Sequence, residues 1–189
     1  MHQPYHDPFI WHLVSTILVV AGIVYFFTRA YLDYLGKEKV VVCENDRTPF
    51  SLHHKDEESM TIATDIVIAN EGKQCCTIMD AFVRPLLPSE QYDGVFVRGR
   101  VVRHDAERED DYFEAVLIER GDKMSVRVEI TFIPRNGKPI DEALAAVPDF
   151  LAELIWEETG RTPWHYEKVS LHIAGKEVAK LAGVEYRFD

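Results

Sequence analysis

An almost entirely apolar segment near the N-terminus constrains this chain more than any other feature. Residues 9–27, FIWHLVSTILVVAGIVYFF, contain one ionisable side chain, that of His12. As an α-helix, a segment of this length extends about 28 Å, close to the roughly 30 Å hydrocarbon core of a bilayer. Trp11 lies near one end and Tyr25 near the other, where aromatic residues gather at membrane interfaces. The segment predicts one transmembrane helix over residues 9–27.

The flanks of this segment bear on its processing and its orientation. The preceding tail, residues 1–8, has no Lys or Arg, and no small-residue cleavage pattern follows the segment, which favours a permanent anchor over a signal peptide. Arg29, Lys37 and Lys39 follow it closely. The positive-inside rule therefore predicts a single-pass protein with its large domain in the cytoplasm. Sandwich modules on single anchors often face outward, so the opposite orientation stays open.

The remainder divides into a juxtamembrane linker, residues 28–39, and one domain, residues 40–189. The linker is predicted to extend the helix as far as Gly36. The whole chain has 189 residues and a formal net charge of −11, and all but one of its 21 basic residues follow Gly36 together with 30 acidic ones. An acidic domain without a basic stripe argues against nucleic acid as a partner.

Alternation of apolar and polar residues dominates the domain. Met124–Phe132 is apolar at every second position, and Met60–Ile68 and Val169–Ile173 repeat the pattern. Further strands are predicted at Val40–Cys43, Gln74–Val83, Val95–Val102 and Tyr112–Ile118. Short alternating strands separated by turn residues predict a mainly β fold, an antiparallel sandwich.

One segment also carries a family resemblance. Residues 60–85, MTIATDIVIANEGKQCCTIMDAFVRP, form a strand pattern that ends in Asn-x-Gly and a second strand pattern directly after it. This resembles the early hairpin of bacterial immunoglobulin-like domains of the CARDB type, with a fainter likeness in residues 121–132. The resemblance implies an immunoglobulin-like sandwich that serves as a binding or spacer module, and it implies no catalytic chemistry.

A helical insertion is predicted before the last strand. Residues 140–159 place Leu144, Val147 and Leu151 at helical spacing, and Gly160 follows as a C-cap. Pro148 is expected to break this segment into two short helices. Two interpretations remain open: the insertion caps the core, or it presents a surface to a partner.

Candidate contact residues occur in two places. His12, Ser15 and Gly22 share one side of the apolar helix, where small residues let another helix approach closely. His12 is interpreted as an interfacial residue, a helix contact or the ligand of a tetrapyrrole. Trp164, His165 and Tyr166 precede the last strand, and their rings are either flaps of the core or anchors of an interface.

No catalytic motif, metal site or cofactor is predicted. The chain lacks the nucleophile-elbow, zinc-protease and phosphate-loop patterns. The acidic run 105–114 does not fit the EF-hand spacing and reads as a solvated loop. The three cysteines, two of them adjacent, favour reduced thiols.

The sequence therefore predicts a non-enzymatic, single-pass accessory subunit of a membrane complex, with integral membrane proteins as partners. The alternative is a membrane-anchored module that binds a ligand or a peptide.

Overall fold

The computed structural model describes residues 8–43, 46–105 and 112–187. The chain forms two compact units, Met1–Gly36 and Lys37–Asp189, and each is described by itself. Most of the predicted N-terminal tail and most of the acidic run lie outside the described residues.

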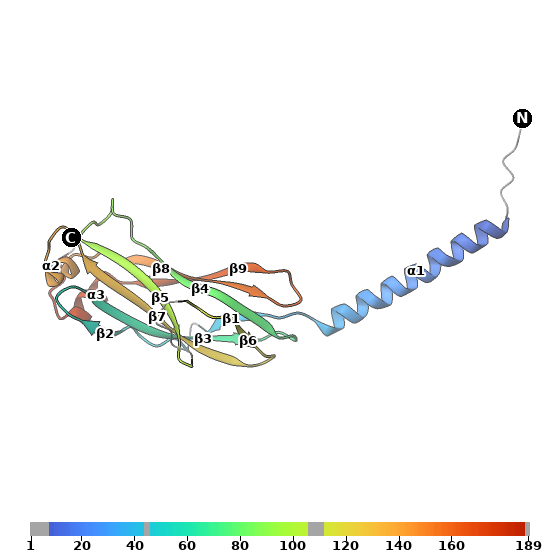
Figure 1. The fold of residues 1–189 in the computed structure, drawn as a ribbon, viewed down its shortest axis with the longest axis horizontal. Helices are drawn as coiled ribbons and strands as arrows, with labels where there is room; N and C mark the ends of the chain where they lie inside the picture. The colour runs from blue at the N-terminus through green and yellow to red at the C-terminus, as the bar shows by residue number, and fades with distance from the viewer. Residues whose placement is uncertain (1–7, 44–45, 106–111, 188–189) are drawn as a thin grey trace, which may run out of the picture. The chain divides into compact units, whose positions relative to one another are not determined.

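The first unit contains a single helix, α1, which spans Pro8–Leu35 (Figure 1). It is the one helix among the described residues that is long and apolar enough to cross a membrane, with a mean hydropathy of 2.1, and a signal sequence would share this property. None of its residues is buried. The helix ends where Gly36 adopts a positive φ of 70° and donates its backbone N–H to the Leu32 and Asp33 carbonyls.

The second unit is mainly β, and it contains two antiparallel sheets stacked on each other (Figure 1). The five-stranded sheet has the order β1-β3-β7-β5, and β2 pairs with β3 beyond this path. Its strands are β1 (Val40–Cys43), β2 (Ser51–Lys55), β3 (Met60–Asn70), β5 (Val95–Arg103) and β7 (Lys123–Pro134). The four-stranded sheet has the order β6-β4-β8-β9. Its strands are β4 (Cys76–Leu86), β6 (Val116–Ile118), β8 (Phe150–Thr159) and β9 (His165–Ile173).

The core fills the space between the sheets. Alternate residues of β7, the central strand of the larger sheet, are fully buried, as are alternate residues of β8 on the facing sheet. These side chains are Val126, Val128, Ile130 and Phe132 on β7, and Phe150, Ala152, Leu154 and Trp156 on β8. The prediction of a mainly β, antiparallel fold is confirmed. Every second side chain of these strands points to the same face, and these faces form the core between the two sheets.

The predicted helical insertion is wrong over its second half. A short helix, α2, spans Ile140–Ala145, but β8 occupies Phe150–Thr159 as a central strand. Pro148 does break the helix, as expected. The residues beyond it also alternate, with Ala152 and Leu154 inward and Leu151 and Ile155 outward, and this pairing with β4 and β9 overrides the helical spacing.

The domain is closed at one end by two helices. Helix α3 spans Gly175–Ala182 and lies beside α2 (Figure 1). A left-handed glycine, Gly183, ends α3 by donating its N–H to the carbonyls of Ala179 and Lys180. The apolar side of α3 buries Val178 and Ala182, so the helix completes the core.

At the other end, the segment that follows α1 is tied into the domain. The Lys39 carbonyl accepts from the Glu71 N–H at 2.8 Å, and the Lys37 carbonyl accepts from the Lys73 N–H at 2.7 Å. Asn70, fully buried, holds the same turn by donating to the Ile118 carbonyl and accepting from the Gly72 N–H. Of the residues assigned to a linker by sequence, 28–35 are therefore helical, and 37–39 belong to the β domain.

Candidate partner-binding surfaces

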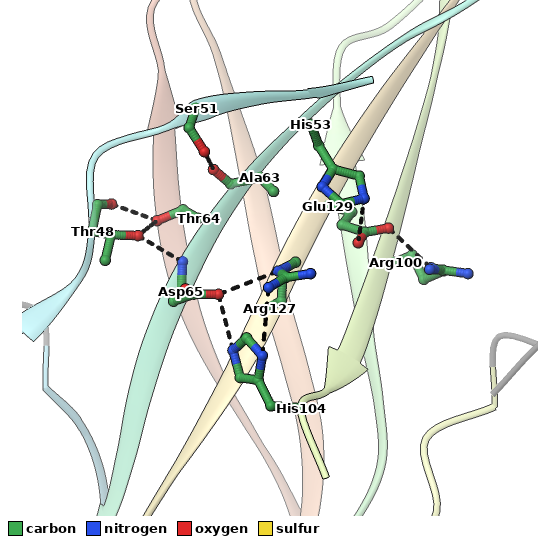
Figure 2. Close-up of polar contacts among 10 residues, drawn as sticks. All are labelled: Thr48, Ser51, His53, Ala63, Thr64, Asp65, Arg100, His104, Arg127 and Glu129. Carbon is green, nitrogen blue, oxygen red and sulfur yellow. Dashed lines mark hydrogen bonds and ion pairs between the residues drawn. The ribbon is translucent and has the colours of Figure 1, made fainter. Parts of the chain in front are cut away.

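The outer face of the five-stranded sheet is charged, and its charges are paired with one another. Asp65 on β3 accepts from His104 Nε2 at 3.1 Å and lies 3.5 Å from Arg127 Nε on β7 (Figure 2). Asp65 and Arg127 are also direct cross-strand partners. Such opposite-charge pairs stabilise a sheet modestly, and here they neutralise the carboxylate and the guanidinium within the protein.

A second group on the same face surrounds Glu129 of β7. Its Oε2 accepts from Arg100 Nε at 3.1 Å, and its Oε1 lies 3.7 Å from His53 Nε2 (Figure 2). Glu129 is nearly covered, at 5% exposure, although it lies on the outward side of β7. These residues border an open hollow of about 330 Å³. The guanidinium of Arg100 compensates the charge of Glu129, while Glu129 Oε1 is buried without a hydrogen-bond partner among the described residues.

The outer face of the four-stranded sheet is different, because large apolar side chains are exposed on it. We call this set the apolar patch. Its members are Phe82 (46% exposed), Leu86 (37%), Leu117 (57%), Leu151 (41%), Trp164 (63%) and Tyr166 (57%). The strand register brings them together in rows across β4, β8 and β9, with Leu86 opposite Leu151 and Phe82 opposite Ile155.

A β-bulge in β4 produces this arrangement. Asp80 has a positive φ of 49°, and the register with β8 shifts between Met79 and Phe82. The extra residue reverses the alternation of side chains. Cys76 and Ile78 point inward before the bulge, and Ala81 and Val83 point inward after it. Phe82 therefore faces outward, where a regular strand would have buried it.

The side chains of Trp164, His165 and Tyr166, at the start of β9, separate onto two sides of the sheet. Trp164 and Tyr166 point outward and pack edge to face, with ring centroids 5.8 Å apart. The His165 side chain is 36% exposed, and its Nε2 lies 3.2 Å from Glu158 Oε1 and 3.5 Å from Glu167 Oε1. The structure therefore adds Trp164 and Tyr166 to the apolar patch, and it places His165 in an ion pair at the edge of the sheet.

Glu158 and its neighbours form a buried polar group at the end of β8. Burial raises the pKa of the Glu158 carboxyl, while a hydrogen bond from Trp156 Nε1 at 3.1 Å opposes the increase. Burial also raises the pKa of the adjacent Cys76 thiol to about 12. This cysteine stays protonated at neutral pH and is a poor nucleophile.

Glu38 joins the turn between β8 and β9 to the start of the domain. Its carboxylate accepts from the Arg161 N–H at 3.0 Å and from the Thr162 N–H at 2.7 Å. Burial acts to raise the pKa of Glu38, but hydrogen bonds from Thr162 and Arg161 outweigh it and lower the pKa to about 2. A Cβ at position 160 would lie 2.6 Å from Glu38 Cδ, so a larger residue there would displace this carboxylate.

On α1, the predicted contact residues are all exposed. The Ser15 hydroxyl donates to the His12 carbonyl at 3.0 Å, so its hydrogen bond is made within the helix. A side chain added at Gly22 would meet no atom of the protein within 4 Å. The structure thus places His12, Ser15 and Gly22 on one continuous helix, and all three residues are exposed on its surface. It brings none of them near a cofactor-like cluster, and the described residues contain no group of three His, Cys, Asp or Glu suited to a metal.

Sequence reasoning missed the patch residues of β4, β6 and β8. Their outward orientation depends on the bulge at Asp80 and on the pairing of β8, and neither is visible in a linear pattern. In the sequence, the large aromatic residues Trp164 and Tyr166 were the one indication of this surface.

No protein-family model matches the chain, and no curated protein matches it in sequence. Three solved structures of low identity are similar to this chain. A putative ApaA protein from Bordetella pertussis is 10% identical, with 74% of this chain and 94% of that chain covered and a TM-score of 0.37. The GAE domain of GGA2p from Saccharomyces cerevisiae is 8% identical, with 73% and 98% covered and a TM-score of 0.34. The CooA pilin subunit from enterotoxigenic Escherichia coli is 10% identical, with 72% and 96% covered and a TM-score of 0.31. All three are β-rich, and no conclusion about function rests on them.

Proposed function

We propose that this protein is a single-pass accessory subunit of a membrane protein complex. The observation that carries the proposal is the apolar patch, which exposes six large side chains on one outer face. The other outer face also exposes Phe96 and Ile133, but it carries the paired charges Asp65–Arg127 and Glu129–Arg100 as well. Large contiguous apolar patches on soluble surfaces mark protein or membrane contacts. Tyr and Trp at such a patch are the residue types that most often dominate binding energy.

The partner we propose for this patch is a second protein in the same membrane. Helix α1, with its mean hydropathy of 2.1, would confine the domain to the bilayer surface. Tethering raises the effective concentration of other membrane-bound proteins and favours them over soluble ones. Two of the charges on this face, Glu153 and Lys168, pair with each other, and Arg84 and Glu157 also lie on its outward positions. A partner for this face therefore needs polar groups beside its apolar ones.

Helix α1 contributes the second part of the proposed contact. In lipid, helices associate through close packing and interhelical hydrogen bonds, because the hydrophobic effect does not distinguish helix from lipid. Gly22 offers an open position for another backbone, and His12 offers a hydrogen bond on the same side. We further propose an immunoglobulin-like variant of the sandwich and a cytoplasmic location, the latter from the Lys and Arg residues that follow the helix.

The proposal predicts a partner whose recovery depends on the apolar patch. The full chain, tagged at its C-terminus, is purified from its native membranes in mild detergent. We expect an integral membrane protein at fixed stoichiometry. Trp164→Ala with Tyr166→Ala should lower its recovery at least tenfold, because truncating buried interface aromatics typically costs about 2 kcal/mol or more each.

Phe96→Ala is the matched control, since Phe96 is equally exposed, at 52%, on the other sheet. It should leave the recovery unchanged. A monodisperse monomer, or equal losses from the patch variant and from Phe96→Ala, would contradict the proposed function.

A further inference from the structure

The open hollow on the outer face of the five-stranded sheet is a candidate binding site distinct from the apolar patch. Its volume is about 330 Å³, and residues of four strands line it: His53 on β2, Thr61 on β3, Arg98 and Arg100 on β5, and Glu129, Thr131 and Ile133 on β7. Two of its three charged residues are arginines, although the whole chain carries a formal net charge of −11. The hollow is therefore a local concentration of cationic groups on an acidic protein.

The one carboxylate of the hollow is engaged within the protein. Glu129 Oε2 accepts from Arg100 Nε at 3.1 Å, and Glu129 Oε1 is buried, with His53 Nε2 3.7 Å away (Figure 2). A guanidinium has five N–H donors, so Arg100 can hold Glu129 and a ligand together. The hollow therefore offers a ligand mainly N–H and O–H donors, which suits an anion.

Two threonine hydroxyls in the hollow have one hydrogen to spare. Thr61 Oγ1 and Thr131 Oγ1 lie 2.9 Å apart, and either can donate to the other. This bond uses one of their two hydroxyl hydrogens, and no described residue accepts the second one. Thr61 is only 8% exposed, so Thr131 is the more accessible of the pair. Because buried polar hydrogens favour a partner, the pair is ready to donate to an acceptor in the hollow.

The strand register places the arginines next to this hydroxyl pair. Arg98 lies opposite Thr131, and Thr131 lies opposite Thr61 on its other side. Directly opposite residues have Cβ atoms about 4.5–5.5 Å apart. Arg100 follows Arg98 by two positions, so it projects from the same face of β5. Donors from neighbouring strands therefore converge on one part of the hollow.

We propose that this hollow binds a small aromatic phosphate monoester. Its phosphate accepts from Arg98, from the Thr131 hydroxyl and from N–H groups of Arg100, because guanidinium groups form strong charge-assisted bonds to phosphate. Phosphate oxygens point in several directions and can meet donors from β5 and β7 together, whereas a planar carboxylate matches a single guanidinium. Every residue used lies within the β domain, so this assignment does not depend on the proposed membrane partner.

An apolar shelf beside the donors holds the ring of the ligand. Phe96 and Ile133 are cross-strand partners, 52% and 38% exposed, and Ile133 itself lines the hollow. An apolar cavity of about 150 Å³ is large enough for benzene. A hollow of about 330 Å³ therefore has room for a single ring together with its phosphate group.

Isothermal titration of phenyl phosphate into the purified full chain in non-ionic detergent, at fixed ionic strength, tests the proposal. We expect saturable binding at one site per chain, no competition by phenol, and much weaker competition by benzoate. Arg98→Gln should weaken binding by roughly tenfold or more. The matched control Arg120→Gln removes an exposed arginine from the turn before β7 and should leave the affinity unchanged.

Two further variants test the hydroxyl and the shelf separately. Thr131→Val keeps the shape of the side chain but removes its hydroxyl, and it should weaken binding by about tenfold, the effect of one hydrogen bond to a charged group. Phe96→Ala should weaken the binding of phenyl phosphate and leave that of inorganic phosphate unchanged. Circular dichroism verifies the fold of each variant. The proposal is overturned by absence of saturable binding, by equal competition from benzoate, or by equal affinities in Arg98→Gln, Thr131→Val and the native chain.

Discussion

We expect the replacement of Val128 by aspartate to unfold the β domain. Val128 is fully buried at the centre of β7, opposite Thr64 on β3 and Val101 on β5. The new carboxylate would face the core with no cation beside it, so it must be buried charged or protonated, and either costs several kcal/mol. A domain of this size is stable by about 5–15 kcal/mol, so a loss of this magnitude removes most of its stability.

Urea unfolding, followed by circular dichroism on residues 37–189, measures this effect. That fragment contains the whole core cluster. Arg127→Ala is the matched control on the neighbouring outward position, where the ion pair with Asp65 and the contact with His104 Nδ1 are lost, at a cost of about 0.5–1 kcal/mol. Equal stabilities for the two variants would show that the inward and outward positions of β7 are misassigned.

The second large effect is expected at Glu38. Its carboxylate is 8% exposed and holds two backbone N–H groups of the β8–β9 turn. Because the pKa is lowered to about 2 from 4.5, the ionised form is favoured in the folded state. The resulting stabilisation is on the order of 3 kcal/mol and is fully present above the unfolded pKa. It is lost as the pH falls from about 4.5 towards about 2.

Glu38→Gln removes this dependence while keeping the size of the side chain. We expect the variant to be less stable than the native domain at pH 7 and to lose less additional stability between pH 5 and pH 2.5. Glu119→Gln, at an exposed position, should follow the native profile. Parallel pH profiles for the native domain and Glu38→Gln in urea titrations would show that the carboxylate does not hold the turn.

Strands with one buried face could be predicted from the sequence, and strands without that pattern could not. β1 and the core of β7 were predicted correctly because alternation of apolar residues is a local property. β2 was missed because its residues are almost all exposed. β8 was mistaken for a helix, because its apolar residues fit both the helical spacing and the alternation of a strand. Only the pairing with β4 and β9 selects the strand.

The candidate surface was predictable only in part, for a similar reason. Trp164 and Tyr166 are large rings next to a turn, and such residues suggest an interface by type alone. Phe82 and Leu151 face outward because of a bulge and a strand pairing formed with distant residues.

The most direct test of the accessory-subunit proposal exchanges the helix and leaves the β domain intact. Residues 9–27 are replaced by leucine, which preserves membrane insertion because insertion depends on total hydrophobicity. Gly22→Leu and His12→Leu are made alongside, and Gly22→Leu fits the helix sterically. Tagged chains are recovered from gently solubilised membranes, and co-purified membrane proteins are quantified by mass spectrometry. We predict that the all-leucine helix inserts but loses the stoichiometric partner, and that Gly22→Leu weakens its recovery. Recovery of the same partner at the same stoichiometry by the all-leucine helix would contradict the proposal and reduce α1 to a tether.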